Sequence, residues 1–93
     1  MTNQLIKIEL TALANNSNSF NGKIYGDGSV YIGGVKYFLS EYNISSNDFI
    51  SQVENAKGEY YEKEMEFQDE YMDIFGKGSE KVQAELINYI NSL

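Results

Sequence analysis

The chain has 93 residues, of which 42% are hydrophobic and 14% aromatic, and its formal net charge is −7. This is enough apolar material for one compact domain, and the chain is too short for two. It contains no cysteine and no histidine, which excludes disulfides, zinc clusters, thiol nucleophiles and histidine-based catalysis. The negative charge disfavours direct binding to nucleic acid or to an anionic membrane surface, because both require cationic groups.

Residues 6–12 alternate between apolar and polar side chains, which predicts a strand at about 4–13. Ile6, Ile8 and Leu10 are separated by single polar residues, a period of two that predicts a strand with one buried face. The segment lacks the basic start and the unbroken apolar run of a signal peptide. No run approaches the roughly 18 apolar residues of a membrane-spanning helix. A cytoplasmic location is therefore the default expectation.

Residues 15–22 are polar and predict a surface loop, and residues 23–39 form three short β-rich runs. The runs are separated by Asp-Gly at 27–28 and Gly-Gly at 33–34, dipeptides suited to two-residue type I′ hairpin turns. We therefore predict an antiparallel meander, with the first strand added at one edge.

At residue 45 the apolar period becomes helical. Ser45, followed by Asp48 three residues later, resembles a capping box and predicts a helix at about 46–57. Gly58 either ends this helix or only bends it. A second helical pattern covers about 59–75.

A third helix is expected at about 79–92, after a C-cap at Gly76 and with Ser79 as its N-cap. Its apolar stripe consists of Val82, Leu86, Tyr89, Ile90 and Leu93. The predicted fold is thus α+β in one domain, 1–93, with a small three- to four-stranded antiparallel sheet followed by two or three helices that cover one face.

Residues 59–73 read EYYEKEMEFQDEYMD and hold seven of the fourteen carboxylates but only one of the seven lysines. At about 100° per residue, one arc of a helix here collects the apolar side chains Tyr60, Tyr61, Met65, Phe67, Tyr71, Met72, Ile74 and Phe75. The adjacent arc collects six carboxylates, namely Glu59, Glu62, Glu66, Asp69, Glu70 and Asp73. Only Glu64 and Gln68 fall on the apolar side.

An acidic run usually forms a solvated outer face, and that interpretation stays open. Against it, Glu62/Glu66, Glu66/Glu70 and Asp69/Asp73 are like-charged pairs four residues apart, which destabilise an isolated helix. The six carboxylates recur about every 4 Å of helix axis, close to the ~3.4 Å spacing of phosphates on one strand of duplex DNA.

Three tyrosines at the border of the acidic arc have two interpretations. Tyr60, Tyr61 and Tyr71 either pack in the core or serve as interface anchors, because tyrosine is enriched at binding hot spots.

Other sites are disfavoured by the residues present. Gly26, Gly28, Gly33 and Gly34 lack the spacing of a phosphate-binding loop, and calcium-loop registers beginning in the acidic stretch place aromatic residues at ligand positions. Paired carboxylates for glycoside hydrolysis need a deeper cleft than a domain of this size offers. We expect no enzymatic activity, no metal and no cofactor.

The segment YFLSEYNISSNDFISQVENAKGEYYEKEMEFQDEYMDIF, within about residues 30–75, resembles the small phage-encoded anti-CRISPR proteins that inhibit type II effector nucleases. In the best-known family of this kind, a helix and a three-stranded sheet precede the remaining helices. The resemblance implies that the acidic helix imitates the PAM duplex in the pocket of the PAM-reading arginines. The family's first helix has no predicted counterpart here, and its acidic hairpin contacts are replaced by Gly33, Gly34 and Lys36. Only the six carboxylates of the acidic arc carry over.

The expected function is therefore non-catalytic inhibition, in which the acidic helix fills a basic nucleic-acid-binding groove on a partner protein such as a CRISPR effector nuclease. Two other classes stay open. One is a phage or mobile-element interaction module that forms homo-oligomers through apolar helix faces, and the other is an immunity or antitoxin protein that neutralises a basic nuclease. The sequence does not determine the oligomeric state.

Overall fold

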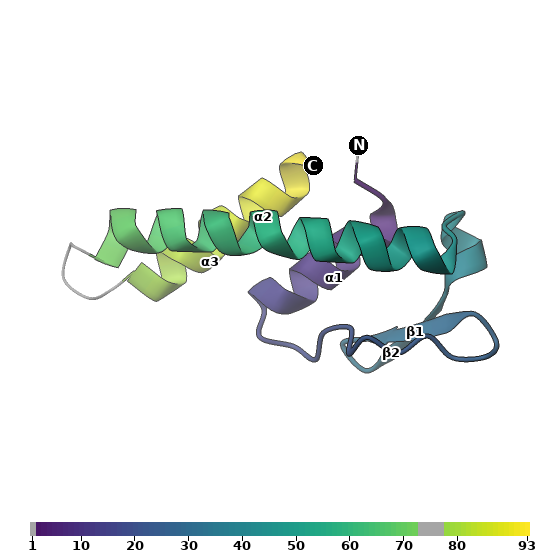
Figure 1. The fold of residues 1–93 in the computed structure, drawn as a ribbon. Coiled ribbons are helices and arrows are strands. Elements are labelled where there is room, and N and C mark those ends of the chain that lie inside the picture. The colour runs from purple at the N-terminus through teal and green to yellow at the C-terminus, as the bar shows by residue number, and fades with distance from the viewer. Residues whose placement is uncertain (1, 73–77) are drawn as a thin grey trace.

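A computed structural model describes residues 2–72 and 78–93 of the chain. Its elements are α1 (Gln4–Ala14), β1 (Ser29–Ile32), β2 (Val35–Phe38), the 3₁₀ helix η1 (Leu39–Tyr42), α2 (Ser46–Met72) and α3 (Gly78–Ser92). The long helix α2 runs the length of the molecule, α1 and α3 pack against it, and the β-hairpin lies below α1 (Figure 1). The α+β class is confirmed, although the sheet has only two strands among the described residues.

The first segment is helix α1, so the predicted strand at 4–13 is wrong. Asn3 caps this helix, because its side-chain Oδ1 accepts a hydrogen bond from the Leu5 N–H at 2.9 Å. Leu5 and Ile6 are both buried, and so are Glu9 and Leu10 four residues later; a helix repeats such adjacent pairs on one face, whereas a strand's alternation would put neighbours on opposite faces. Residues 4–14 also favour a helix by propensity, because leucine, alanine, lysine and glutamate are strong helix formers.

The β-hairpin is shorter than the predicted meander. β1 and β2 pair antiparallel with Ile32 opposite Val35, and Gly33 and Gly34 both have positive φ, as a type I′ turn requires. At the earlier Asp-Gly dipeptide, only the glycine has positive φ. Its N–H donates to the Tyr25 carbonyl, so this turn spans four residues from Tyr25 and is not a two-residue type I′ turn.

Helix α2 is continuous through Gly58, so the two helices predicted at 46–57 and 59–75 are one element of 27 residues. The predicted cap at its start is confirmed, because the Asp48 N–H donates to Ser45 Oγ at 3.2 Å. At the typical rise of 1.5 Å per residue, α2 is about 40 Å long. The predicted C-cap at Gly76 lies outside the described residues.

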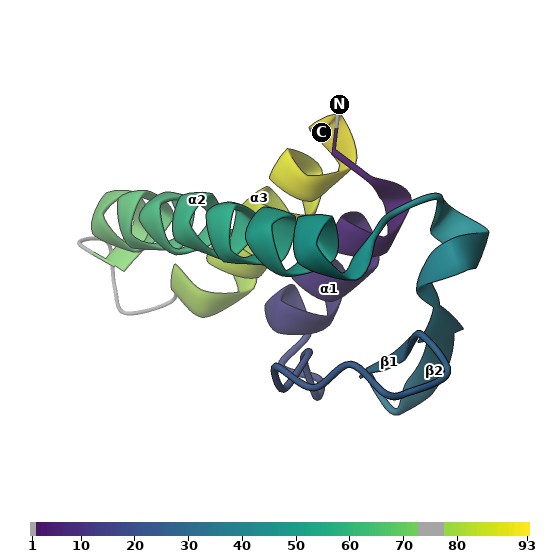
Figure 2. The same cartoon turned by 45° about the vertical axis from the view of Figure 1, so that its right-hand side comes forward.

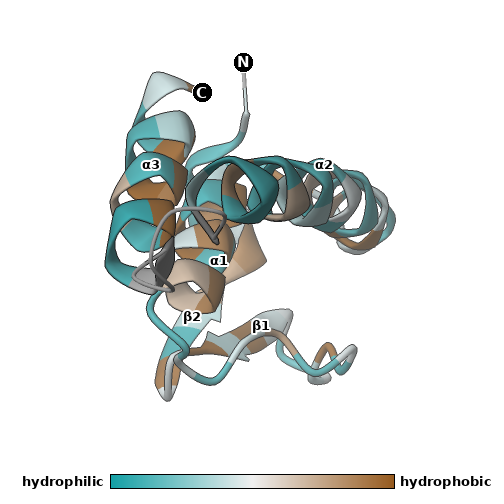
Figure 3. Cartoon of the chain, turned by 90° about the vertical axis from the view of Figure 1, so that its left-hand side faces the viewer, coloured by the Kyte–Doolittle hydropathy of each residue, from teal (hydrophilic) through white to brown (hydrophobic). Residues whose placement is uncertain are grey.

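The core lies where the three helices and β1 meet. Figure 3 views the structure along α2 and shows apolar stripes of α1 and α3 turned toward the interior, with the hairpin on the α1 side. The stripe predicted for α3 is confirmed, with Val82, Leu86 and Ile90 buried and Tyr89 and Leu93 partly buried. Helix α3 begins at Gly78, so Ser79 lies in its first turn instead of preceding it. Figure 2 shows the same packing from a second direction.

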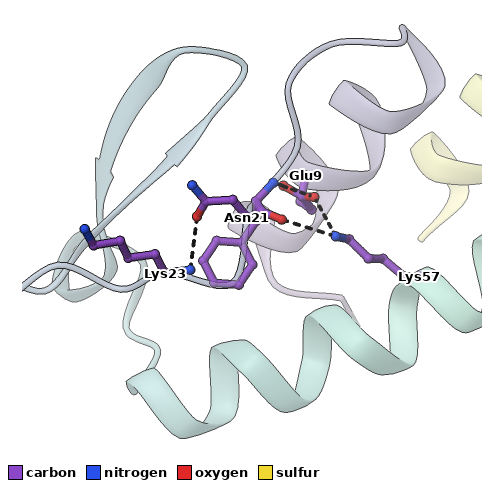
Figure 4. A network of polar contacts seen from close by, with 5 residues as sticks. Glu9, Asn21, Lys23 and Lys57 are labelled. Atoms are coloured by element: carbon purple, nitrogen blue, oxygen red, sulfur yellow. Dashed lines mark hydrogen bonds and ion pairs between the residues drawn. The ribbon is translucent and has the colours of Figure 1, made fainter.

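One buried carboxylate connects three parts of the fold. Glu9, on α1, accepts hydrogen bonds from the Phe20 N–H at both carboxylate oxygens, at 2.9 and 2.7 Å. Lys57 of α2 lies 3.3 Å from Glu9 Oε1, and its ammonium also donates to the Phe20 carbonyl at 3.5 Å (Figure 4). The pair holds the loop after α1 against α2 and leaves Lys57 turned away from the acidic stretch.

Candidate partner-binding site

The acidic arc of α2 is exposed. We call Glu59, Glu62, Glu66, Asp69 and Glu70 the acidic ridge, and all five side chains are exposed to solvent. The sixth carboxylate of the predicted site, Asp73, lies outside the described residues. Ile74 and Phe75 also lie outside them, and of Met72 the structure describes only the backbone. Because one uninterrupted helix carries all five described carboxylates, their spacing is set by the backbone of α2.

The ridge is nearly free of compensating positive charge. Within the described part of α2, the only cation paired with it is Lys63, whose Nζ lies 3.4 Å from Glu66 Oε2. Both side chains are largely exposed, and such pairs contribute little to stability. The like-charged spacing of Glu62, Glu66 and Glu70 along the helix therefore remains a source of negative potential.

One edge of the ridge adjoins α3. The Tyr89 hydroxyl donates to Glu59 Oε2 at 3.4 Å. Partial burial raises the pKa of Tyr89, and the nearby Glu59 carboxylate raises it further. Lys63 Nζ also lies 5.9 Å from the Tyr89 ring centroid. Glu59 is thus oriented by the fold, whereas Glu62 and Asp69 lie farther around the helix from α3.

The three tyrosines of the predicted site divide between core and surface. Tyr60 is only 2% exposed and belongs to the core, and burial, followed by the Glu64 carboxylate, raises its pKa to about 12. Tyr71 is partly buried against the core, and its pKa is raised by burial and then by Glu85. Only Tyr61, 50% exposed, presents its ring to solvent. The packing interpretation therefore holds for two of the three.

The apolar arc is narrower than the sequence indicates. Tyr60, Phe67 and Tyr71 face the core, whereas Met65 is 66% exposed and lies on the open side with Tyr61. Helical phase alone places Met65 and Phe67 in the same apolar half of the helix. The structure separates them, because α1 and α3 cover only the side of α2 that is centred on Tyr60.

Glu64 and Gln68 lie on the core side of α2, as the helical phase predicts. They line a cleft of about 410 Å³ beside Tyr60, with Leu86 of α3 and Leu13 of α1 among the other lining residues. The cleft and the acidic ridge are on different sides of α2. Glu64 thus raises the pKa of the Tyr60 hydroxyl and does not belong to the acidic ridge.

Two residues on the open side were not among the predicted site residues. Helical phase predicts a packing role for Met65, and it predicts for Gly58 only the end or a bend of a helix. Gly58 lies within α2, is exposed, and has no atom within 4 Å of the position that a Cβ would occupy. Its signal in the sequence is a glycine in the interior of a helical pattern, where glycine is disfavoured.

Neither a metal-binding cluster nor a membrane-spanning helix is found in the described part of the chain. No group of three or more Asp or Glu side chains there is arranged to hold a metal ion. None of the described helices combines the length and the apolar character needed to cross a membrane.

Comparison with known proteins identifies no relative. No protein-family model matches the chain, and no significant match was found among curated proteins or among solved structures. The geometry of α2 is therefore the principal basis for assigning a function.

Proposed function

We propose that the protein is a non-catalytic inhibitor that presents the acidic ridge of α2 to a basic nucleic-acid-binding groove, and that the partner is a type II CRISPR effector nuclease. The observation that carries the proposal is a row of five exposed carboxylates on one uninterrupted helix, with a single weakly paired lysine.

The charge spacing supports imitation of a nucleic-acid strand. From Glu59 to Glu70 the helix advances about 16 Å, which gives one carboxylate per roughly 3 to 4 Å of axis. One strand of duplex DNA presents a phosphate every ~3.4 Å. A groove lined with arginine and lysine to hold a phosphate backbone would meet a similar density of negative charge on α2.

The packing of the other helices against α2 also supports the proposed inhibitory function. α1 and α3 both pack along α2, and the Tyr89 hydroxyl contacts Glu59 at the edge of the ridge. A ridge held in place before binding loses little conformational entropy when a partner docks. Opposite charges should also steer the two proteins together and make association fast and salt-sensitive.

The element order adds a further argument. The resemblance to anti-CRISPR proteins implies a helix before the sheet. Helix α1 precedes the hairpin, so the chain does not differ from the family in this respect, although the predicted strand at 4–13 did. The acidic hairpin contacts of that family still have no counterpart at Gly33, Gly34 and Lys36. The proposed pose therefore uses α2 alone.

Charge reversal on the ridge tests this function. We expect Glu62→Lys with Glu66→Lys to abolish inhibition of target-DNA binding and cleavage by a purified effector–guide RNA complex, because two attractive contacts become repulsive. The matched control reverses two exposed carboxylates off the ridge, Glu41→Lys with Glu80→Lys, and should still inhibit. Circular dichroism shows whether both variants are folded. Inhibition that survives in the ridge variant rules out charge mimicry, and wild-type protein without effect on the complex rules out this partner.

A second candidate, an interaction module with an apolar surface, is favoured by the exposure of Tyr61 and Met65. Salt separates the two functions. The affinity of a charge mimic falls steeply as ionic strength rises, whereas the affinity of an apolar module hardly changes.

A further inference from the structure

Gly58 has no explanation within the chain. It lies in the interior of α2, where glycine weakens a helix because it gives the unfolded backbone more freedom. It is not among the described glycines with positive φ, and a Cβ added there would meet nothing within 4 Å. Neither backbone conformation nor internal packing therefore requires a glycine at this position.

Among the described side chains of α2, the two most exposed apolar ones lie on the same side of the helix as Gly58. At 100° per residue, Gly58, Tyr61 and Met65 fall within an arc of about 60°. Tyr61 is 50% and Met65 66% exposed. Figures 1 and 2 both draw α1 and α3 behind α2, so one long side of α2 has no other element against it. We call Gly58, Tyr61 and Met65 the open patch.

The open patch combines uncovered backbone at Gly58 with exposed apolar side chains. The missing side chain of Gly58 leaves the α2 backbone uncovered one turn before Tyr61. The Tyr61 ring packs edge-to-face on the buried Tyr60 ring, with 5.5 Å between centroids. A ring that is already supported loses little freedom on binding, which suits it to be an interface anchor.

The charges around the open patch favour a partner segment that carries lysine or arginine. Glu62 and Asp69 follow directly around the helix from Met65, so the patch borders the acidic ridge. The two nearest lysines of α2 are directed elsewhere, with Lys57 held by Glu9 and Lys63 beside Glu66 and Tyr89. An occupant of the patch therefore faces negative charge on one flank.

We infer that the open patch receives apolar side chains from a basic amphipathic segment of a protein partner, one seated over Gly58 beside Tyr61 and the next against Met65, with lysine or arginine of the same segment on the acidic ridge. This inference rests on the proposed function, because the ridge supplies the electrostatic half of the contact. It adds that the partner's groove is not uniformly cationic and carries an apolar group within about one helical turn of its cations.

Two synthetic peptides of equal length and net charge test the inference. One is a lysine-rich helix with leucines along one face, and the other has glutamine in place of every leucine. In fluorescence anisotropy, we expect the wild-type protein to bind the leucine peptide at least about tenfold more tightly, because only that peptide fills the patch. Tyr61→Gln with Met65→Gln should remove this preference, since glutamine preserves helix propensity without the apolar surface.

Two further variants make the test specific. Val35→Thr changes a comparably exposed apolar residue on the hairpin and should keep the full preference. Gly58→Ala places a methyl group over the uncovered backbone and should weaken leucine-peptide binding several-fold while leaving the glutamine peptide unaffected. A glycine that serves only the helix would not produce this selective loss.

The outcomes separate this inference from the proposed function. Equal binding of the two peptides, binding of neither, or a preference that survives in the Tyr61/Met65 variant overturns the inference and leaves the effector assay to decide the function. If Glu62→Lys with Glu66→Lys has no effect in either assay, the proposed function fails. Self-association of the wild-type protein that disappears in the Tyr61/Met65 variant would show a second copy as the occupant and would also overturn the inference.

Discussion

At the scale of single residues, Glu9 shows how far a helical phase can alter the role of a side chain. The alternating pattern places Glu9 on a solvent face, whereas in α1 it is fully buried and holds Phe20 and Lys57. Burying a carboxylate is costly unless hydrogen bonds and an opposite charge compensate it. Here the Phe20 N–H and the Lys57 ammonium do so, and the Glu9–Lys57 pair joins the polar loop to α2.

Glu9→Gln should therefore destabilise the protein by about 2–3 kcal/mol, because it leaves the partly buried Lys57 ammonium without its carboxylate. Urea denaturation at neutral pH measures the change. Asp27→Asn, which breaks the exposed Asp27–Lys36 pair of the hairpin, is the control and should cause a much smaller loss. Equal losses in the two variants would contradict the structural role assigned to Glu9.

The raised pKa of Tyr60 predicts that the protein loses stability at alkaline pH. Burial raises its pKa from 10.0 to about 12, so between these values the unfolded chain releases a proton that the folded protein retains. This contribution to stability is complete below about pH 10 and is lost as the pH rises toward 12, by up to roughly 1–2 kcal/mol. Tyr60→Phe should lose less stability over the same interval in urea denaturation. An identical decline in wild type and variant would show that Tyr60 is not the group responsible.

At the scale of elements, α2 is the decisive difference between expectation and structure. Two helices separated at Gly58 would let the whole acidic ridge turn relative to the residues before the glycine, whereas one continuous helix fixes the direction of the ridge relative to the core. The cap at Ser45 and the packing of Phe49, Val53 and Tyr60 in the core stabilise α2 on both sides of the glycine. Core packing on both sides of Gly58 thus outweighs the low helix propensity of glycine.

Gly58→Ala should raise the stability of the protein by about 0.5–1 kcal/mol, because alanine is the better helix former and its Cβ meets no neighbour. Thermal denaturation followed by circular dichroism at 222 nm measures the shift in Tm. Gly28→Ala is an instructive contrast, since Gly28 has a φ of 78°, and this change should lower Tm. A lowered Tm for Gly58→Ala would indicate that α2 needs the glycine for its own geometry.

At the scale of the whole molecule, the fold is elongated, with principal extents of 48 × 24 × 18 Å. The long axis follows α2, so the acidic ridge and the open patch lie along the longest element. The hairpin lies on the α1 side, near the start of α2 and away from its C-terminal end (Figure 1). For the proposed partner we expect one extended binding surface, on which charge would govern the approach and apolar contact the residence time.

Several features could be predicted from the sequence because they depend on neighbours within one turn. The cap at Ser45, the turn at Gly33 and Gly34, and the stripe of α3 are all set by residues at most four positions apart. The segment 4–13 could not be assigned in this way. Its apolar residues satisfy a period of two and a helical period together, and contacts with α2, α3 and β1 select the helix.

The sequence by itself determined that one face of a helix would carry the carboxylates, since helical phase depends only on spacing along the chain. Only the tertiary structure decided which residues beside that face are free. Tyr60 and Tyr71 pack inward, Tyr61 and Met65 remain exposed, and Gly58 lies uncovered within a continuous helix. The physical reason is that burial depends on where α1 and α3 cross α2, and those contacts join residues far apart in the sequence.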